Sequence, residues 1–333
     1  MLLQLVLIIA VAYGANGRIV TDEYEVTTDH FVLMASERDG VHLVNLKYQP
    51  PNTDVSDKDL MVYLFTRANT REGFQIKAEG FSGAIKSQYF DANKISLFVN
   101  HGYGGNYLGG ANRAIRDAIL SKHDVNVFLV DSAKAREFYT TAVLCAPGVS
   151  KREAEFIRKF ADFNEVPYDK IHLAGHSLGA HVSGGVGAQL DGKVRSILGL
   201  DPALPLFSYN NTETRLDVTD GQFVQVIHTN AGLKGFSSSI GHADYFPNGG
   251  GMNQPGCGTD LLGSCAHARV YNLYKESVLT SGFLAKRCDS YENFKAGLCD
   301  HNPTSLMGEF PLDTRAKGDY YLDTAAAEPF ALI

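Results

Sequence analysis

Short apolar runs separated by amphipathic segments constrain the fold of this chain more than any other feature. The strand candidates are residues 60–65, 95–99, 125–130, 170–175, 194–200 and 223–228. Most are continuously apolar, which is typical of strands covered on both faces. Helices are predicted at about 111–121, about 151–163, 178–190 and 267–280. Strands alternating with helices predict an α/β domain, a mostly parallel central sheet flanked by helices, with its active site at the carboxyl ends of the strands.

Composition narrows the class of protein further. The chain has 333 residues, of which 44% are hydrophobic and 20% charged. These values are ordinary for a globular protein and exclude a disordered, collagen-like or coiled-coil chain. The net charge is −7, and no basic stripe is present, so we expect no nucleic-acid partner. The length suits one large domain or two small ones.

The N-terminal residues resemble a secretory signal. Residues 1–13 are apolar apart from one Gln, and this run is too short to span a bilayer. Small residues follow, so we predict a signal peptide at 1–17 and a mature, extracellular chain of 18–333. The alternative is a buried first strand. No later run is long enough for an integral membrane segment. The sequon at Asn210 predicts a glycosylation site on a secreted protein.

A candidate nucleophile lies between a predicted strand and a predicted helix. Residues 175–179 read Gly-His-Ser-Leu-Gly, directly after strand 170–175 and directly before helix 178–190. This strand–turn–helix setting is that of a nucleophile elbow, in which a strained turn exposes the serine hydroxyl above the sheet. The sequence therefore predicts Ser177 as the nucleophile. The alternative is an ordinary N-cap serine.

A serine hydroxyl needs a base and an orienting acid, which follow it in the order acid, then histidine, in enzymes with such an elbow. Asp201 directly follows strand 194–200, and no later carboxylate follows a predicted strand so closely. We therefore predict Asp201 as the acid. The histidines beyond it are His228, His242, His267 and His301. His267 lies between a loop and the last amphipathic segment, which favours it as the base, but position alone leaves the other three open.

An oxyanion formed during acyl transfer needs backbone N–H donors. One donor is predicted at Leu178, the residue after the nucleophile. The second is predicted at Tyr103, within the glycine-rich segment 101–105 that follows strand 95–99. The alternative for this segment is a simple glycine turn.

Taken together, these residues resemble the pancreatic-lipase family, whose fold is the α/β-hydrolase fold, and most closely its insect phospholipase A1 branch. The motifs that carry the resemblance are FVNHGYGGN (98–106), AGHSLGAHVSG (174–184), LGLDPALPLF (198–207), VQVIHTN (224–230), GHADYFPNGG (241–250), CAHARVYNLYKESV (265–278) and the closing YYLDT with Pro329 and Phe330. The family's triad falls on Ser177, Asp201 and His267. Its oxyanion donors fall on Tyr103 and Leu178.

The resemblance also implies how lipid reaches the site. The family's lid lies between two cysteines, here Cys257 and Cys265, with only residues 258–264 between them. The neighbouring loop, 231–241, is also short. Within the family a short lid and a short loop resemble phospholipases A1. Leu261 and Leu262 are then the lipid-facing lid residues, or alternatively part of a small satellite core. The family's C-terminal β-sandwich domain is not expected, so 18–333 is predicted to be a single catalytic domain.

Cysteines and calcium follow the same family pattern. It implies two disulfides, Cys257–Cys265 and Cys288–Cys299. Cys145 then has no disulfide partner in this pattern and is expected to be a buried apolar residue. In the family's calcium loop, Arg215, Asp217 and Asp220 match, whereas Thr212 replaces a glutamate. Backbone carbonyls can supply part of a calcium site, so calcium binding stays an alternative. A solvated acidic turn is the simpler interpretation, and we predict no cofactor and assign no metal.

The expected activity is that of a secreted carboxylic-ester hydrolase, a phospholipase A1 that releases the sn-1 fatty acid through an acyl-enzyme. Its expected partner is a phospholipid or other acyl-ester lipid at a membrane or micelle surface. The alternatives are a neutral triglyceride lipase or galactolipase, and a non-enzymatic lipid carrier of the yolk-protein type.

Overall fold

A computed structural model of the chain describes residues 18–332, except residues 22–23, 28–30 and 37–39. The predicted signal peptide, 1–17, lies outside the described residues. Within them the dominant element is one 11-stranded sheet, with the strand order β14-β13-β15-β12-β11-β10-β9-β7-β8-β5-β6. Its strands are β5 (Leu60–Phe65), β6 (Phe74–Lys77), β7 (Ser96–Asn100), β8 (Asn126–Ser132), β9 (Ile171–His176), β10 (Ser196–Leu200), β11 (Val224–Ile227), β12 (Ala243–Pro247), β13 (Leu284–Arg287), β14 (Thr304–Leu306) and β15 (Gly318–Leu322).

The centre of this sheet is parallel, as the alternation of strands and helices predicts. Strand β9 pairs in parallel with β7 on one side and β10 on the other, and the parallel pairing continues outward to β8 and to β15. Antiparallel strands occur only toward the two ends of the sheet, where β5 pairs with β8 and β6, and β13 pairs with β15 and β14. All six predicted strands are present, each shifted by two residues or fewer at either end.

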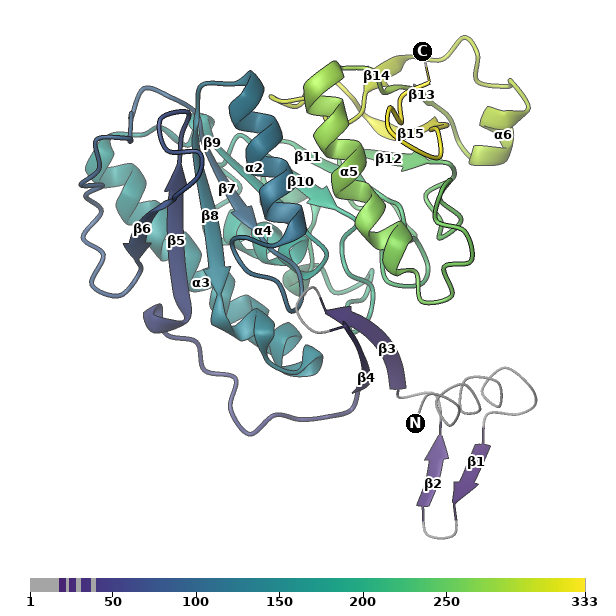
Figure 1. Cartoon of the computed structure of the whole chain (residues 1–333), viewed down its shortest axis with the longest axis horizontal. Helices are drawn as coiled ribbons and strands as arrows, with labels where there is room; N and C mark the ends of the chain where they lie inside the picture. Colours follow the sequence, from purple (N-terminus) through teal and green to yellow (C-terminus); the bar gives the residue numbers. More distant parts are fainter. Residues whose placement is uncertain (1–17, 22–23, 28–30, 37–39, 333) are drawn as a thin grey trace.

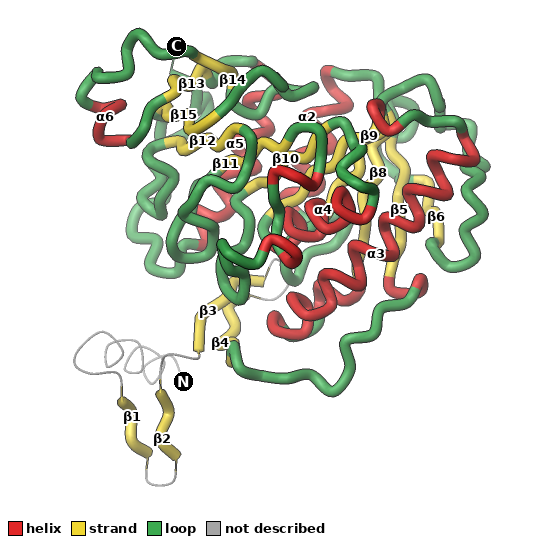
Figure 2. The backbone as a smooth tube through the Cα atoms, turned by 180° about the vertical axis from the view of Figure 1, so that it is seen from behind, coloured by secondary structure: helices red, strands yellow, loops and turns green. Residues whose placement is uncertain are grey.

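Helices cover both faces of the sheet. Helices α2 (Gly110–Lys122) and α5 (Ser264–Thr280) pack together on one face, and α3 (Tyr139–Asn164) and α4 (Leu178–Gln189) pack together on the other (Figures 1 and 2). A short helix, α6 (Tyr291–Lys295), follows β13. The 3-10 turns are η2 (Asp57–Asp59), η3 (Ala133–Arg136), η4 (Tyr168–Lys170), η5 (Thr212–Thr214) and η6 (Val218–Asp220).

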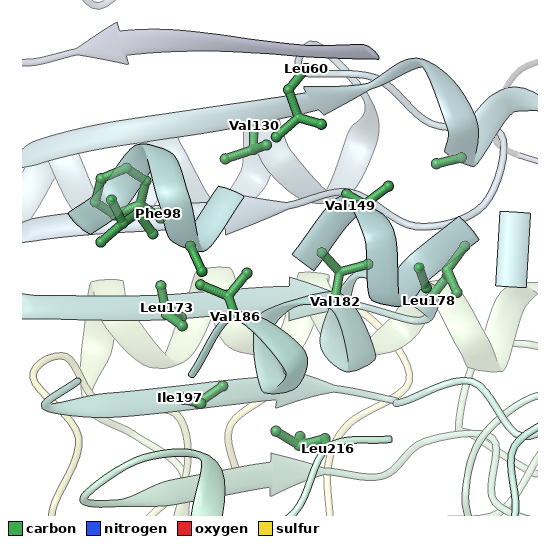
Figure 3. Close-up of a cluster of buried hydrophobic side chains, with 14 of the residues drawn as sticks. Leu60, Phe98, Val130, Val149, Leu173, Leu178, Val182, Val186, Ile197 and Leu216 are labelled. Atoms are coloured by element: carbon green, nitrogen blue, oxygen red, sulfur yellow. The ribbon is translucent and has the colours of Figure 1, made fainter. Parts of the chain in front are cut away.

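The layers bury two hydrophobic cores, one on each face of the sheet. Figure 3 shows part of the core under α3 and α4, where Val149, Val182 and Val186 of the helices meet Phe98, Leu173 and Ile197 of the strands. The core under α2 and α5 contains Leu97, Ala174 and Leu198, the neighbours of those strand residues along the chain. Successive strand residues therefore enter opposite cores, which explains why the runs are continuously apolar.

Helix α3 is longer than the sequence predicts. It begins at Tyr139 rather than near residue 151, and Pro147 lies inside it. A proline removes one helical hydrogen bond, and Pro147-Gly148 reads as a helix breaker. The first half nevertheless buries Tyr139, Ala142 and Val149 against the sheet, and this tertiary packing outweighs the local preference.

Two hairpins precede the sheet in the chain. One pairs β1 (Arg18–Thr21) with β2 (Tyr24–Thr27), and the other pairs β3 (Phe31–Ser36) with β4 (Gly40–Asn45). The second hairpin lies beyond the edge at which the parallel strands end (Figure 1). Its Met34 is buried and joins the core under α3 and α4. The sequence analysis identifies neither hairpin.

No helix in the described part of the chain is long and apolar enough to cross a membrane.

Candidate active site

Ser177 occupies a sharp turn between β9 and α4. Its backbone has φ 56° and ψ −122°, a region that residues other than glycine rarely adopt and that costs about 1–3 kcal/mol. The surrounding chain holds it there: Ser177 donates its N–H to the carbonyl of Leu200 on β10 (2.9 Å), and its own carbonyl accepts from Ala203 (3.3 Å). This turn has the strand–turn–helix geometry that the sequence predicts for a nucleophile elbow.

The elbow depends on three glycines that allow close backbone approach. A Cβ on Gly175 would lie 2.1 Å from the carbonyl oxygen of Gly179, and a Cβ on Gly179 would lie 2.4 Å from the carbonyl oxygen of Asn100. A Cβ on Gly102 would lie 3.1 Å from that of Ser177. Strand, helix and the loop after β7 therefore converge on the serine more closely than side chains allow.

Asp201 follows β10 directly and is fully buried. Its Oδ1 accepts the backbone N–H groups of Thr229 (2.8 Å) and Asn230 (3.0 Å), and its Oδ2 lies 2.5 Å from Nδ1 of His267. A buried carboxylate is costly unless it is paired and hydrogen-bonded, and Asp201 meets both conditions. The carboxylate is thus fixed with one oxygen available to the imidazole.

The contact with Asp201 also fixes the protonation pattern of His267. A carboxylate only accepts, so Nδ1 carries the proton and, in the neutral ring, Nε2 carries the lone pair. Burial lowers the pKa of His267 below its ordinary 6.5, and the hydrogen bond and charge of Asp201 offset part of that effect. The imidazole is therefore neutral near pH 7 and able to accept a proton at Nε2.

The other three candidate histidines lie elsewhere. His228 is fully buried and bonded to Asp244 (2.9 Å) and to the carbonyl of Phe236 (2.8 Å). His242 accepts the N–H of Val224, and His301 is exposed. Among these four histidines Asp201 is bonded to His267 alone, which favours His267 over the others.

Ser177 and His267 line the same cleft, of about 180 Å³. Gly102, Tyr103, His176, Lys234, Ser264 and Tyr271 also line it, together with Met34 and Ser36 of the β3–β4 hairpin and Ala268. Within the described residues the Ser177 hydroxyl makes no hydrogen bond, so it is available to a bound molecule. Contacts between a nucleophile and its base are often long in unliganded enzymes.

The two predicted oxyanion donors lie beside the serine. Leu178 is the first residue of α4, where backbone N–H groups have no partner in the helix. Tyr103 lines the cleft, and its ring packs edge-on against Tyr139 at 5.2 Å. Tyr103 therefore lines the cleft, and Leu178 directly follows Ser177 at the start of α4.

His267 begins its helix earlier than predicted. Helix α5 starts at Ser264, so His267 lies in its first turn rather than in the preceding loop. Asp260 caps this turn by accepting the N–H of Ala266 (2.8 Å), and His267 donates its N–H to Gly263 (2.9 Å). His267 is therefore held by a regular helix.

Three features of the cleft and its surroundings are not predicted from the sequence. His176 lies against the ring of His267 (4.7 Å between centroids) and donates from Nε2 to the His267 carbonyl (3.2 Å). Beneath the loop after β7, the side chain of Asn100 donates to the buried Glu153 of α3 (3.1 Å). Burial raises the pKa of Glu153 to about 8. The third feature is Lys234, a buried lysine in the cleft wall.

The predicted lid is a short closed loop. Cys257 and Cys265 form a disulfide, as do Cys288 and Cys299, each with Cα atoms 5.6 Å apart. Within the lid Leu261 is 75% exposed, whereas Leu262 is only half-buried. Cys145 remains a free, buried thiol, and its Sγ lies 3.6 Å from the carbonyl of Thr53. Asn210 of the sequon is exposed.

The loop that resembles a calcium site is held together by its own hydrogen bonds. Arg215 donates to the carbonyls of Tyr209 and Leu216 and lies 3.3 Å from Asp217. Asp217 caps η6, and Asp220 accepts the N–H of Asp217 (2.7 Å). These contacts close the loop through its own donors and acceptors.

Comparisons with known proteins show which family this chain is similar to. The family model described as Lipase matches residues 25–330. Pancreatic lipase-related protein 3 from Homo sapiens is 35% identical over 325 residues, 88% of this chain and 68% of that protein. Lipase member H from Xenopus tropicalis is 32% identical, covering 82% of this chain and 63% of the relative. Pancreatic triacylglycerol lipase from Cavia porcellus is 32% identical, covering 84% and 66%.

This chain thus spans about two thirds of the length of these relatives. Among solved structures, an α/β-hydrolase from a deep-sea metagenome library aligns over 62% of this chain and 73% of its own, at 13% identity and a TM-score of 0.33.

Proposed function

This chain belongs to the lipase family, and we propose that it hydrolyses carboxylic esters of lipids through Ser177, His267 and Asp201. The observation that carries the proposal is the pairing of His267 with Asp201 (2.5 Å) in the cleft that contains Ser177. Position along the chain, local geometry and family membership support the same three residues.

In the proposed mechanism Ser177 Oγ attacks the ester carbonyl while His267 Nε2 takes its proton. The imidazolium that forms is stabilised by the carboxylate of Asp201, whose other oxygen is held in place by two backbone N–H groups. His267 then returns the proton to the leaving alcohol oxygen. Water then attacks the acyl-serine while His267 takes one of its protons. His267 returns that proton to Ser177 Oγ as the fatty acid leaves.

The negative charge on the carbonyl oxygen requires donors that are in place before the reaction. We assign these to the backbone N–H groups of Leu178 and Tyr103. The close approach of Gly102 to Ser177, where a Cβ would lie 3.1 Å from the serine Cβ, supports this assignment because it brings the Tyr103 loop beside the nucleophile.

For the substrate, we propose a phospholipid cleaved at its sn-1 ester. The short disulfide-closed lid supports this choice, since a short lid covers little of the cleft and leaves room for a polar head group. A neutral triglyceride lipase or galactolipase shares every catalytic residue and differs only in the substrate. A non-enzymatic carrier is disfavoured because Ser177, His267 and Asp201 are all present, with His267 paired to Asp201 in the cleft that contains Ser177.

We also propose that the protein is secreted, with residues 1–17 as its signal peptide. Two disulfides support an oxidising compartment. A lipid surface is then its proposed partner, with Leu261 and Leu262 among the residues that contact it.

The substrate assignment is tested by incubating the purified protein with phosphatidylcholine that carries different acyl chains at sn-1 and sn-2. We expect release of the sn-1 acid, with no release by Ser177→Ala. Parallel incubation with a triglyceride emulsion provides the comparison. Preferential release of the sn-2 acid, or hydrolysis of triglyceride alone, would contradict the phospholipase A1 assignment.

A further inference from the structure

Lys234 contributes a buried positive charge to the wall of the catalytic cleft. The side chain lines the same cleft as Ser177 and His267, yet the residue is only 2% exposed. Lysine is almost never fully buried unless its charge is paired, because an ammonium loses much hydration when it leaves water. A buried ammonium at this position is therefore expected to have a negatively charged or hydrogen-bonding partner.

The described residues give this ammonium one hydrogen bond, to the hydroxyl of Ser264 (2.8 Å). No described carboxylate lies within 4.0 Å of its Nζ, the limit that defines an ion pair. Asp260 and Asp201 are the charges that act on it from farther away. Asp201 is already bound to His267 and two N–H groups, and Asp260 caps α5. An ammonium offers three donors, so two of them are available to a ligand.

The backbone of Lys234 is held by hydrogen bonds on both its N–H and its carbonyl. Its N–H donates to the side chain of Asn230 (2.8 Å), and its carbonyl accepts the N–H of Leu204 (2.6 Å). Asn230 in turn donates to the carbonyl of Gly263, at the start of α5 (2.9 Å). These hydrogen bonds connect the loop of Lys234 to the segment after Asp201 and to helix α5, which carries His267.

We propose that Lys234 and Ser264 form an anion-binding subsite that takes the phosphodiester of a glycerophospholipid while its sn-1 ester lies at Ser177. The inference rests on the proposed function and adds the group that recognises the head. The phosphate and the sn-1 ester are attached to the same three-carbon glycerol, so one cleft accommodates both. Phosphate oxygens accept charge-assisted hydrogen bonds from an ammonium and a hydroxyl.

The test compares two substrates that differ only in the phosphate-containing head. Dioleoylphosphatidylcholine and dioleoylglycerol are presented in the same detergent micelles, and oleate release is measured for the wild type and Lys234→Met. Loss of one or two charge-assisted hydrogen bonds corresponds to about 10- to 100-fold. We expect kcat/KM for the phospholipid to fall by that factor and the value for dioleoylglycerol to change by less than about threefold.

Two further variants make the result specific. Lys275→Met removes a half-exposed lysine on α5 that pairs with Glu328 outside the cleft, and neither substrate is expected to respond. Lys234→Gln keeps a donor toward Ser264 without the charge, and we expect the same selective loss as for methionine. Thermal unfolding of each variant shows whether the fold is retained, and Lys234→Gln carries the test if Lys234→Met does not fold.

Equal losses on both substrates would overturn the proposal and make Lys234 a positioning residue for the Asp201–His267 pair. Unchanged phospholipid hydrolysis would also overturn it. Dioleoylglycerol hydrolysis separates these outcomes from failure of the proposed function, because a wild type that cleaves neither substrate contradicts the ester hydrolase itself.

The dependence on pH gives an independent readout. Burial lowers the pKa of Lys234 to about 8, although Asp260 and Asp201 favour its charged form. Raising the pH through 8 therefore discharges the free enzyme's ammonium, whereas His267 on α5 is already neutral in this range. We expect the ratio of phospholipid to dioleoylglycerol kcat/KM to fall above pH 8 in the wild type and to be flat in Lys234→Met. A flat ratio in both would contradict the subsite.

Discussion

At the scale of single residues, Asp201 determines which nitrogen of His267 can act as a base. Its Oδ2 accepts the Nδ1 proton, and its Oδ1 is held by the backbone of Thr229 and Asn230. In Asp201→Asn the two N–H groups still bind the carbonyl oxygen, so the amide nitrogen faces His267. The imidazole then accepts at Nδ1 and carries its proton at Nε2, the wrong tautomer for taking a proton from Ser177.

We therefore expect Asp201→Asn to fold and to lose activity by on the order of 10⁴-fold in kcat, with a smaller effect on KM. Hydrolysis of a soluble short-chain ester measures this without an interface, and thermal unfolding serves as the folding control. A loss of less than about tenfold would show that His267 does not depend on Asp201.

The residues whose places in the fold the sequence predicts are those that directly follow a strand. Ser177 and Asp201 are of this kind. His267 is favoured by position, but only the fold separates it from His228, His242 and His301. No sequence pattern marks Lys234, which is one lysine in a glycine-containing loop. Its place in the cleft wall depends on the fold, in which its backbone is bonded to Asn230 and Leu204.

At the scale of elements, the elbow is the most tightly constrained part of the molecule. A Cβ at Gly175 meets the backbone of both Gly179 and Ala180 within 2.6 Å, so β9 and α4 must move apart to accommodate a side chain. Gly251 offers a matched control, because a Cβ there meets no atom within 4 Å.

We expect Gly175→Ala to lower the free energy of unfolding by about 3 kcal/mol or more and to abolish hydrolysis, whereas Gly251→Ala changes stability by less than about 0.5 kcal/mol. Urea unfolding of the two variants beside the wild type measures the difference. Similar midpoints for both variants would show that the elbow tolerates a wider spacing.

The sequence predicts strands and helices where the hydrophobic pattern is continuous, and it misses them where the pattern is interrupted. The strands β5, β7, β8, β9, β10 and β11 are buried on both faces and are predicted from their apolar runs. By contrast, β14 at the edge of the sheet and its neighbour β13 are short strands that carry lysine, arginine and threonine, so pattern alone does not separate them from loops. The first half of α3 is not predicted because Pro147-Gly148 is typical of a helix end. Its helical structure depends on packing against the sheet.

At the scale of the whole molecule, the cleft lies where the parallel strands end. Strands β7, β9 and β10 point their carboxyl ends at this edge, and the loops after them supply Tyr103, Ser177 and Asp201. Helix α5, on the opposite face of the sheet from α4, brings His267 to the same edge (Figure 1). The two cores on either side fix this convergence, since moving any layer would separate the base from the nucleophile.

The central claim is that Ser177 is the nucleophile of an ester hydrolase. It is tested most directly by reaction with a fluorophosphonate that carries an alkyl chain, followed by mass spectrometry of the proteolysed protein. We predict one adduct per chain, on the peptide that contains Ser177, with activity lost in proportion to labelling and no adduct in Ser177→Ala. Absence of an adduct on active protein, or labelling of another serine that accounts for the loss of activity, would contradict the claim.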